Sequence, residues 1–155
     1  MGVVIIRPWK VSDSSQIVEL VQTILKQEFP QDQQAYPVED LQNLEKSYSG
    51  TGDSFLVAEA EGRIIGTCGV KADGDQTAIL RRFFVDPSQR GQGVGRGLLD
   101  QALAFCRKKK FKEVVIRTAA SMEQAIRVCR KAGFEPDGDW SFGGATLVRY
   151  RLKLS

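Results

Sequence analysis

The segment Arg90–Gly97, which reads RGQGVGRG, most strongly limits what this chain can fold into. A glycine occupies every second position, and Arg90 and Arg96 add positive charge. Glycine loses more conformational freedom on folding than any other residue, so such a run is unfavourable unless the backbone itself has a task. Because a strand-like stretch precedes the segment and a helix-like stretch follows it, we expect an ordered junction between the two.

Two common phosphate-binding patterns do not fit the segment. The pattern GxGxxG needs a glycine at its sixth position, and that position holds Arg96, Leu98 or Asp100, depending on the starting glycine. No lysine follows a glycine here, which excludes GxxxxGK. The remaining interpretation is a run of free backbone N–H groups that opens a helix, a geometry that binds anions such as two successive phosphates. A flexible glycine loop is the alternative.

Length and charge limit the kind of protein. The 155 residues suit one domain over 1–155, large enough to fold without disulfides or metal. Hydrophobic residues make up 42% of the chain and charged residues 26%, which is typical of a soluble protein. The net charge of +3 would favour a small anionic ligand but is too weak to indicate a nucleic-acid partner.

The cysteines and histidines exclude several chemistries. The chain has no histidine, so Ser-His-Asp and Cys-His catalysis are both absent. Its three cysteines, Cys68, Cys106 and Cys129, are odd in number and form no CxxC pair. We therefore expect neither a disulfide framework nor a metal site.

Targeting segments are not evident. The apolar stretch in MGVVIIRPWKVSD is too short for a signal peptide. No stretch approaches the ~18 apolar residues that a membrane span needs. We expect a cytoplasmic protein that does not enter a membrane.

Hydrophobic periodicity predicts an α/β domain with a mixed sheet. The first strand is expected over 3–9, followed by a helix over 12–29 and a shorter one over 37–46. Three strands follow within 54–87, with turns at Glu61-Gly62 and Asp73–Asp75. After the glycine segment come a helix, a strand over 112–118, a helix over 121–134 that ends near Gly133, and a closing strand over 146–154. With a further strand before the closing one, the full order is β-α-α-β-β-β-α-β-α-β-β.

Three stretches resemble one family. VDPSQRGQGVGRGLL resembles the acetyl-CoA motif of the GCN5-related N-acetyltransferases (GNAT), with its (Arg/Gln)-x-x-Gly-x-(Gly/Ala) pattern at Arg90, Gly93 and Gly95. LRRFFV resembles that family's fourth strand. SMEQAIRVCRKAGF resembles its later helix, A-x-x-L-Y-x-x-x-G-F. Order and spacing are similar from about Arg7 to the C-terminus.

The resemblance implies a single-domain fold with a mostly antiparallel sheet flanked by helices, and acetyl-CoA as co-substrate. Backbone N–H groups of the glycine segment would hold its pyrophosphate, and the backbone of Phe83 and Val85 would pair with its pantetheine arm. An N–H near Phe83 would polarise the thioester carbonyl. The implied cofactor-binding residues are Phe83, Phe84, Val85, Arg90, Gly91, Gln92, Gly93, Val94, Gly95 and Arg96.

The resemblance also implies direct attack by an amine of a small molecule or peptide on acetyl-CoA, without a covalent enzyme intermediate. The enzyme would hold the two reactants together and manage their protons. A homodimer is left open. A non-catalytic acyl-CoA-binding module or sensor is the main alternative function, and an interaction protein with a vestigial cofactor site is the weaker one.

The catalytic positions depart from the family pattern. Cys129 occupies the position of the tyrosine that protonates the thiolate, and it is either that acid or a small core residue. Ile79 and Arg117 stand where some members carry a carboxylate. The other candidate catalytic residues are Glu28 and Glu59 as bases, and Tyr48. Each has a plain structural role as its alternative.

Overall fold

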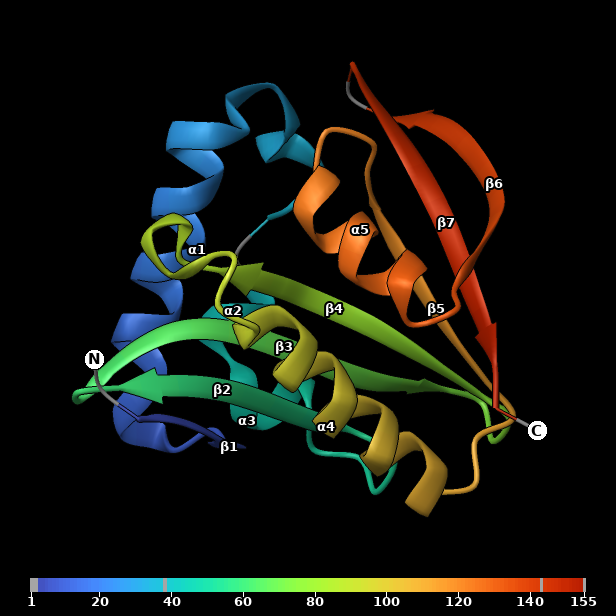
Figure 1. The fold of residues 1–155 in the computed structure, drawn as a ribbon, viewed down its shortest axis with the longest axis horizontal. Helices are drawn as coiled ribbons and strands as arrows, with labels where there is room; N and C mark the ends of the chain where they lie inside the picture. The colour runs from blue at the N-terminus through green and yellow to red at the C-terminus, as the bar shows by residue number, and fades with distance from the viewer. Residues whose placement is uncertain (1–2, 38, 143, 155) are drawn as a thin grey trace.

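The computed structural model describes residues 3–37, 39–142 and 144–154. Within these residues, one sheet of seven strands runs in the order β1-β2-β3-β4-β5-β7-β6 (Figure 1). The strands are β1 (Val4–Pro8), β2 (Ser54–Ala60), β3 (Arg63–Asp73), β4 (Thr77–Val85), β5 (Glu113–Ala119), β6 (Glu135–Phe142) and β7 (Ala145–Lys153). The α-helices are α1 (Ser14–Glu28), α2 (Glu39–Gln42), α3 (Leu44–Ser47), α4 (Val94–Lys108) and α5 (Glu123–Lys131).

The sheet is mixed and mostly antiparallel, as predicted. β4 and β5 are the one parallel pair among the described strands, and helix α4 connects them. Such a parallel pair needs a crossover connection, and the sequence supplies one in the glycine segment and the helix that follows it.

The parallel pair separates partway along its length. Pairing runs from Thr77–Glu113 to Leu80–Ile116 and then stops, although β4 continues to Val85 and β5 to Ala119. Figure 1 shows the two strands together near the C-terminus and apart at their other ends. From residue 81 onward, the side of β4 that faces β5 therefore has no strand paired with it in the described structure.

A hydrophobic core lies on each face of the sheet. α4 and α5 cover one face, and α1 with the short helices α2 and α3 covers the other (Figure 1). The apolar stripe predicted for α4 is buried at Val94, Leu98, Ala102 and Cys106. Burial of these side chains is the main force that fixes α4 on the sheet.

Some predicted boundaries were wrong. The helix expected over 37–46 is two short helices, α2 and α3, separated at Asn43, whose φ of −136° is not helical. The Asn43 side-chain amide donates to the carbonyl of Glu39, the kind of local bond that competes with the helix ladder. The helix expected from Ser121 begins at Glu123, because Met122 is its N-cap. Position 38 lies outside the described residues.

The predicted turns are confirmed. Glu61 and Gly62 have φ of 52° and 77°, the two positive values that a tight hairpin turn needs. Gly74 has a φ of 80° in the next turn, and Gly133 follows α5 with a φ of 106°. No helix in the described part of the chain is long and apolar enough to cross a bilayer.

Candidate functional site

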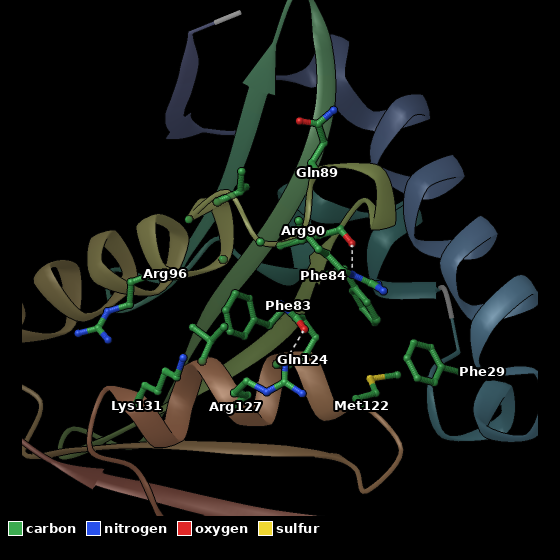
Figure 2. Close-up of a pocket in the computed structure, with 17 residues that line it drawn as sticks. Phe29, Phe83, Phe84, Gln89, Arg90, Arg96, Met122, Gln124, Arg127 and Lys131 are labelled. Atoms are coloured by element: carbon green, nitrogen blue, oxygen red, sulfur yellow. Dashed lines mark hydrogen bonds between the residues drawn. The ribbon is translucent and has the colours of Figure 1, made fainter. Parts of the chain in front are cut away.

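A cavity of about 350 Å³ lies between the separated half of β4, the start of α4 and helix α5 (Figure 2). The predicted cofactor residues that line it are Phe83, Phe84, Val85, Arg90, Gly91, Gly93, Val94, Gly95 and Arg96. Gln92 is the one predicted cofactor residue that does not line this cavity. The structure thus brings the glycine segment and the end of β4 to one cavity.

The glycine segment presents its backbone to open space. Gly91 and Gly93 have φ of 80° and 84°, a conformation that favours glycine. A Cβ built on either would meet nothing within 4 Å. Gly93 is also the N-cap of α4, so the first N–H groups of that helix lack intrahelical partners at the cavity. Together these features make a backbone site that an anion can approach closely.

A β-bulge shapes the β4 wall of the cavity. Thr67 on β3 faces Phe84 and Gly69 faces Arg81, so Cys68 alone stands opposite two β4 residues. One of them, Arg82, has a φ of 55°, and its carbonyl accepts a hydrogen bond of 2.6 Å from the Thr67 hydroxyl. A bulge re-aims the side chains that follow it. Figure 2 shows the ring of Phe83 on the α5 side and that of Phe84 toward Phe29.

Basic side chains surround this cavity. Arg127 and Lys131 of α5 line it together with Arg96 of α4 (Figure 2). The Arg96 Nε donates to Asp100 at 2.9 Å, but half of the Arg96 side chain remains exposed. The positive charge and the free backbone N–H groups both favour a phosphorylated ligand.

Glu28 and Arg90 form one ion pair. The Arg90 Nη1 lies 2.6 Å from the Glu28 Oε1, and its Nη2 donates to Oε2 at 3.2 Å. The Arg90 Nε donates to the carbonyl of Val85. The end of α1 is thereby tied to the glycine segment, and the Glu28 carboxylate is engaged by a cation rather than free in the cavity.

Cys129 lies in the core. Its side chain is fully buried, and its neighbour Val128, rather than Cys129 itself, lines the cavity. Burial raises the pKa of the Cys129 thiol to about 12. Both observations favour the core interpretation over the acid, although the effect of replacing Cys129 stays a prediction.

The other two candidate catalytic residues lie away from the cavity. Glu59 on β2 accepts a hydrogen bond of 2.9 Å from Arg7, which also binds Asp13. Tyr48 is buried against Phe55 and donates to Asp40 at 3.3 Å. Burial raises the pKa of Tyr48 well above its ordinary value. Neither Glu59 nor Tyr48 lines the cavity, so the structure does not bring them to the glycine segment.

Tyr36 lies at this site but is not among the catalytic residues predicted from the sequence. Its hydroxyl accepts a hydrogen bond of 2.7 Å from the backbone N–H of Ala119 and lies 3.1 Å from the Thr118 hydroxyl, both on β5. Its ring packs edge-on against Phe84 of β4, with ring centroids 6.1 Å apart. Tyr36 therefore spans the gap between the separated strands. Its place after the first helix was visible in the sequence, but its partners were not.

A second cavity, of about 460 Å³, is lined by other residues of β4 together with residues of β3, β5, β6 and β7. Ile79 and Arg117, the two positions at which some members of the family are expected to carry a carboxylate, both line it. Tyr36 also lines this cavity, and its partner Phe84 lines the first. The contact of these two rings therefore lies between the two cavities.

The chain is similar in sequence to known N-acetyltransferases. A profile of the Acetyltransferase (GNAT) family matches residues 18–134. N-acetyltransferase 8B of Homo sapiens is 33% identical over 109 residues, which are 66% of this chain and 48% of that protein. N-acetyltransferase 8 of Rattus norvegicus is 32% identical over 106 residues, 64% of this chain and 48% of that protein. The chain spans about half the length of the curated relatives it matches.

Solved structures share the fold. An acetyltransferase of the GNAT family from Staphylococcus aureus Mu50 has a TM-score of 0.82 at 23% identity, covering 99% of this chain and 100% of that one. The protein yncA of Salmonella typhimurium, solved with its cofactor acetyl-CoA, has a TM-score of 0.79 at 20% identity, covering 98% of this chain and 94% of that one. Since the family profile spans most of the sequence and the fold is shared along almost the whole chain, this protein belongs to the acetyltransferase (GNAT) family.

Proposed function

We propose that this protein transfers an acetyl group from acetyl-CoA directly to the amine of a small molecule or peptide. The observation that carries the proposal is the junction of β4 and α4, where an open glycine backbone and an unpaired strand edge border one basic cavity. The curated relatives are N-acetyltransferases, and yncA, which shares the fold, was solved with acetyl-CoA.

The residues present fit acetyl-CoA. The backbone from Gly91 to Arg96 would hold the pyrophosphate, because its open space admits phosphate oxygens close to the N–H groups. The unpaired edge of β4 offers backbone N–H and C=O groups to the amides of the pantetheine arm, in the manner of an added strand. An N–H near Phe83 would donate to the thioester oxygen as negative charge develops there.

The reaction needs little besides position. The amine attacks the thioester carbon, the C–S bond breaks, and the thiolate of coenzyme A leaves. Well-oriented reactants gain roughly 7–11 kcal/mol from proximity alone. Because Glu28 is engaged by Arg90 and Cys129 is buried, we propose that the ammonium loses its proton to water and that the thiolate is protonated from water.

A specific observation also favours a second function, a non-catalytic acyl-CoA-binding module. The residues that line the first cavity include no carboxylate and no tyrosine in the described structure. Such a module would bind acetyl-CoA without consuming it.

A thiol-release assay separates the two functions. The protein is mixed with acetyl-CoA and a panel of amines, and free thiol is followed together with N-acetylated product by mass spectrometry. We expect thiol and product in equal amounts with at least one amine. Tight binding of acetyl-CoA without product from any amine would support the binding module and overturn the enzyme.

A further inference from the structure

The second cavity has a marked excess of positive charge. Its charged lining residues are the cations Lys71, Arg81, Arg82 and Arg117 and the carboxylate Asp73. Trp140 and Leu147 add apolar surface to its wall. Burying cations beside one another is unfavourable unless counter-charges meet them, so the partner of each cation decides what the cavity can bind.

Two of these cations are largely satisfied within the protein. The Lys71 ammonium binds the backbone carbonyl of Ser47 and lies 3.9 Å from Asp53. Arg82 donates from Nε and Nη2 to Asp40. Burial raises the pKa of Asp40, but the hydrogen bond and charge of Arg82 outweigh that effect and leave the pKa below its ordinary value. Asp40 is therefore ionised and committed to Arg82.

Arg82 nevertheless keeps an unused donor. Its side chain is 3% exposed, and its Nη1 is buried without a hydrogen-bond partner in the described structure. A buried guanidinium nitrogen without a hydrogen-bond partner is unfavourable, so such an atom is the exception in native proteins. An anion in the cavity that Arg82 lines would supply the missing acceptor.

Arg81 and Arg117 are the cations whose guanidinium groups could still bind an anion. Arg81 is 40% exposed and lies 4.0 Å from the Asp40 carboxylate, at the limit of an ion pair. Arg117 is exposed and has no ion pair or side-chain hydrogen bond within the described structure. Both line the cavity. Guanidinium groups match carboxylates and phosphates in a two-pronged geometry.

We propose that the acetyl acceptor is an amine that also carries an anionic group, a carboxylate or a phosphate, bound by Arg81, Arg82 and Arg117. The inference rests on the proposed function and names the substrate class for it. Tyr36 lines this cavity and touches Phe84 of the first cavity, so the anionic group would be held beside the ring contact that lies between the two cavities.

Matched pairs of amines test the proposal. L-phenylalanine is compared with L-phenylalaninamide, and O-phosphoethanolamine with ethanolamine. The first amine of each pair carries an anionic carboxylate or phosphate, and the second carries an uncharged amide or hydroxyl there; they are called the anionic and the neutral member for that group. The phenyl ring that the first pair shares suits the apolar wall at Trp140. Thiol release from acetyl-CoA gives kcat/KM for each. We expect one anionic member to exceed its neutral partner at least tenfold, about 1.4 kcal/mol. The pair that shows the difference distinguishes carboxylate from phosphate.

The variant Arg117→Gln should remove the preference for the amine that carries the anionic group. We expect kcat/KM for the anionic amine to fall about tenfold while that for its neutral partner stays within twofold. Arg117 is exposed, so the substitution leaves the core intact. Arg107→Gln is the matched control, because Arg107 is an exposed arginine near the end of α4 that lines neither cavity.

The outcomes separate this inference from the proposed function. Equal or faster acetylation of the neutral members would overturn the inference and leave the function standing. If no amine is acetylated, the function fails, and the inference is then decided by thermal shift. Stabilisation by an anionic amine but not by its neutral partner, lost in Arg117→Gln, supports an anion site. Equal shifts with both members would contradict it.

Discussion

Arg82 combines two unfavourable features in one residue. Its φ of 55° lies in the left-handed region, which residues other than glycine rarely adopt, and its charged side chain is buried. The Thr67 hydroxyl binds its carbonyl and Asp40 binds its guanidinium, so the protein offsets both features with specific partners. Strained residues held this firmly cluster at functional sites. Arg82 lies where β4 leaves β5, and it is the last β4 residue of the second cavity before Phe83 of the first.

At the same scale, Cys129→Ala should leave turnover nearly intact. The thiol is fully buried and its pKa is raised to about 12, so it is a poor match to an acid at neutral pH. We expect less than a tenfold loss of kcat and about 1–2 kcal/mol lower stability from the space left in the core. Steady-state kinetics and denaturant unfolding measure the two effects.

Cys106→Ala is the matched control, because Cys106 is equally buried and its pKa is also raised to about 12. A hundredfold or larger loss of kcat in folded Cys129→Ala alone, with acetyl-CoA affinity unchanged, would show that Cys129 is the acid.

At the scale of elements, the separation of β4 from β5 defines the site. Pairing stops at Leu80 and Ile116, and the bulge at Arg82 turns the rest of β4 away. Tyr36 links the two strands across the gap through its hydrogen bonds to β5 and its contact with Phe84. We therefore expect its hydroxyl to have a positioning role.

Tyr36→Phe should separate the two substrates kinetically. Loss of the hydroxyl leaves the Ala119 N–H without its acceptor, which lowers stability by about 1–3 kcal/mol. Since Tyr36 lines the second cavity and not the first, we expect KM for the amine to rise severalfold while the Kd for acetyl-CoA stays within threefold. Tyr150→Phe is the control, because Tyr150 lines neither cavity. Equal effects of the two variants on KM would contradict the positioning role.

At the scale of the whole molecule, local features could be predicted from sequence and long-range partners could not. The strands, α4 and the glycine segment have periodic or compositional signals, and they occur about where the sequence predicts them. The break between α2 and α3 occurs at the single residue Asn43, which is too local a feature to alter the helical periodicity on which the prediction is based. The Arg82–Asp40, Arg90–Glu28 and Tyr36–Ala119 contacts span 42, 62 and 83 residues, and no spacing rule links such positions. The sequence therefore predicts Glu28 as a candidate base and does not reveal that the fold pairs it with Arg90.

The central claim is that the glycine segment binds acetyl-CoA through its backbone, and calorimetric titration of Gly93→Val tests it most directly. Gly74→Val is the matched control: Gly74 has a φ of 80° against 84° for Gly93, and both have open space around them, but Gly74 lies in a turn away from the cavity. A valine side chain at position 93 would block the approach of phosphate. We predict that Gly93→Val abolishes binding of acetyl-CoA and that Gly74→Val binds it like the parent protein. Parent-like affinity in folded Gly93→Val would contradict the account.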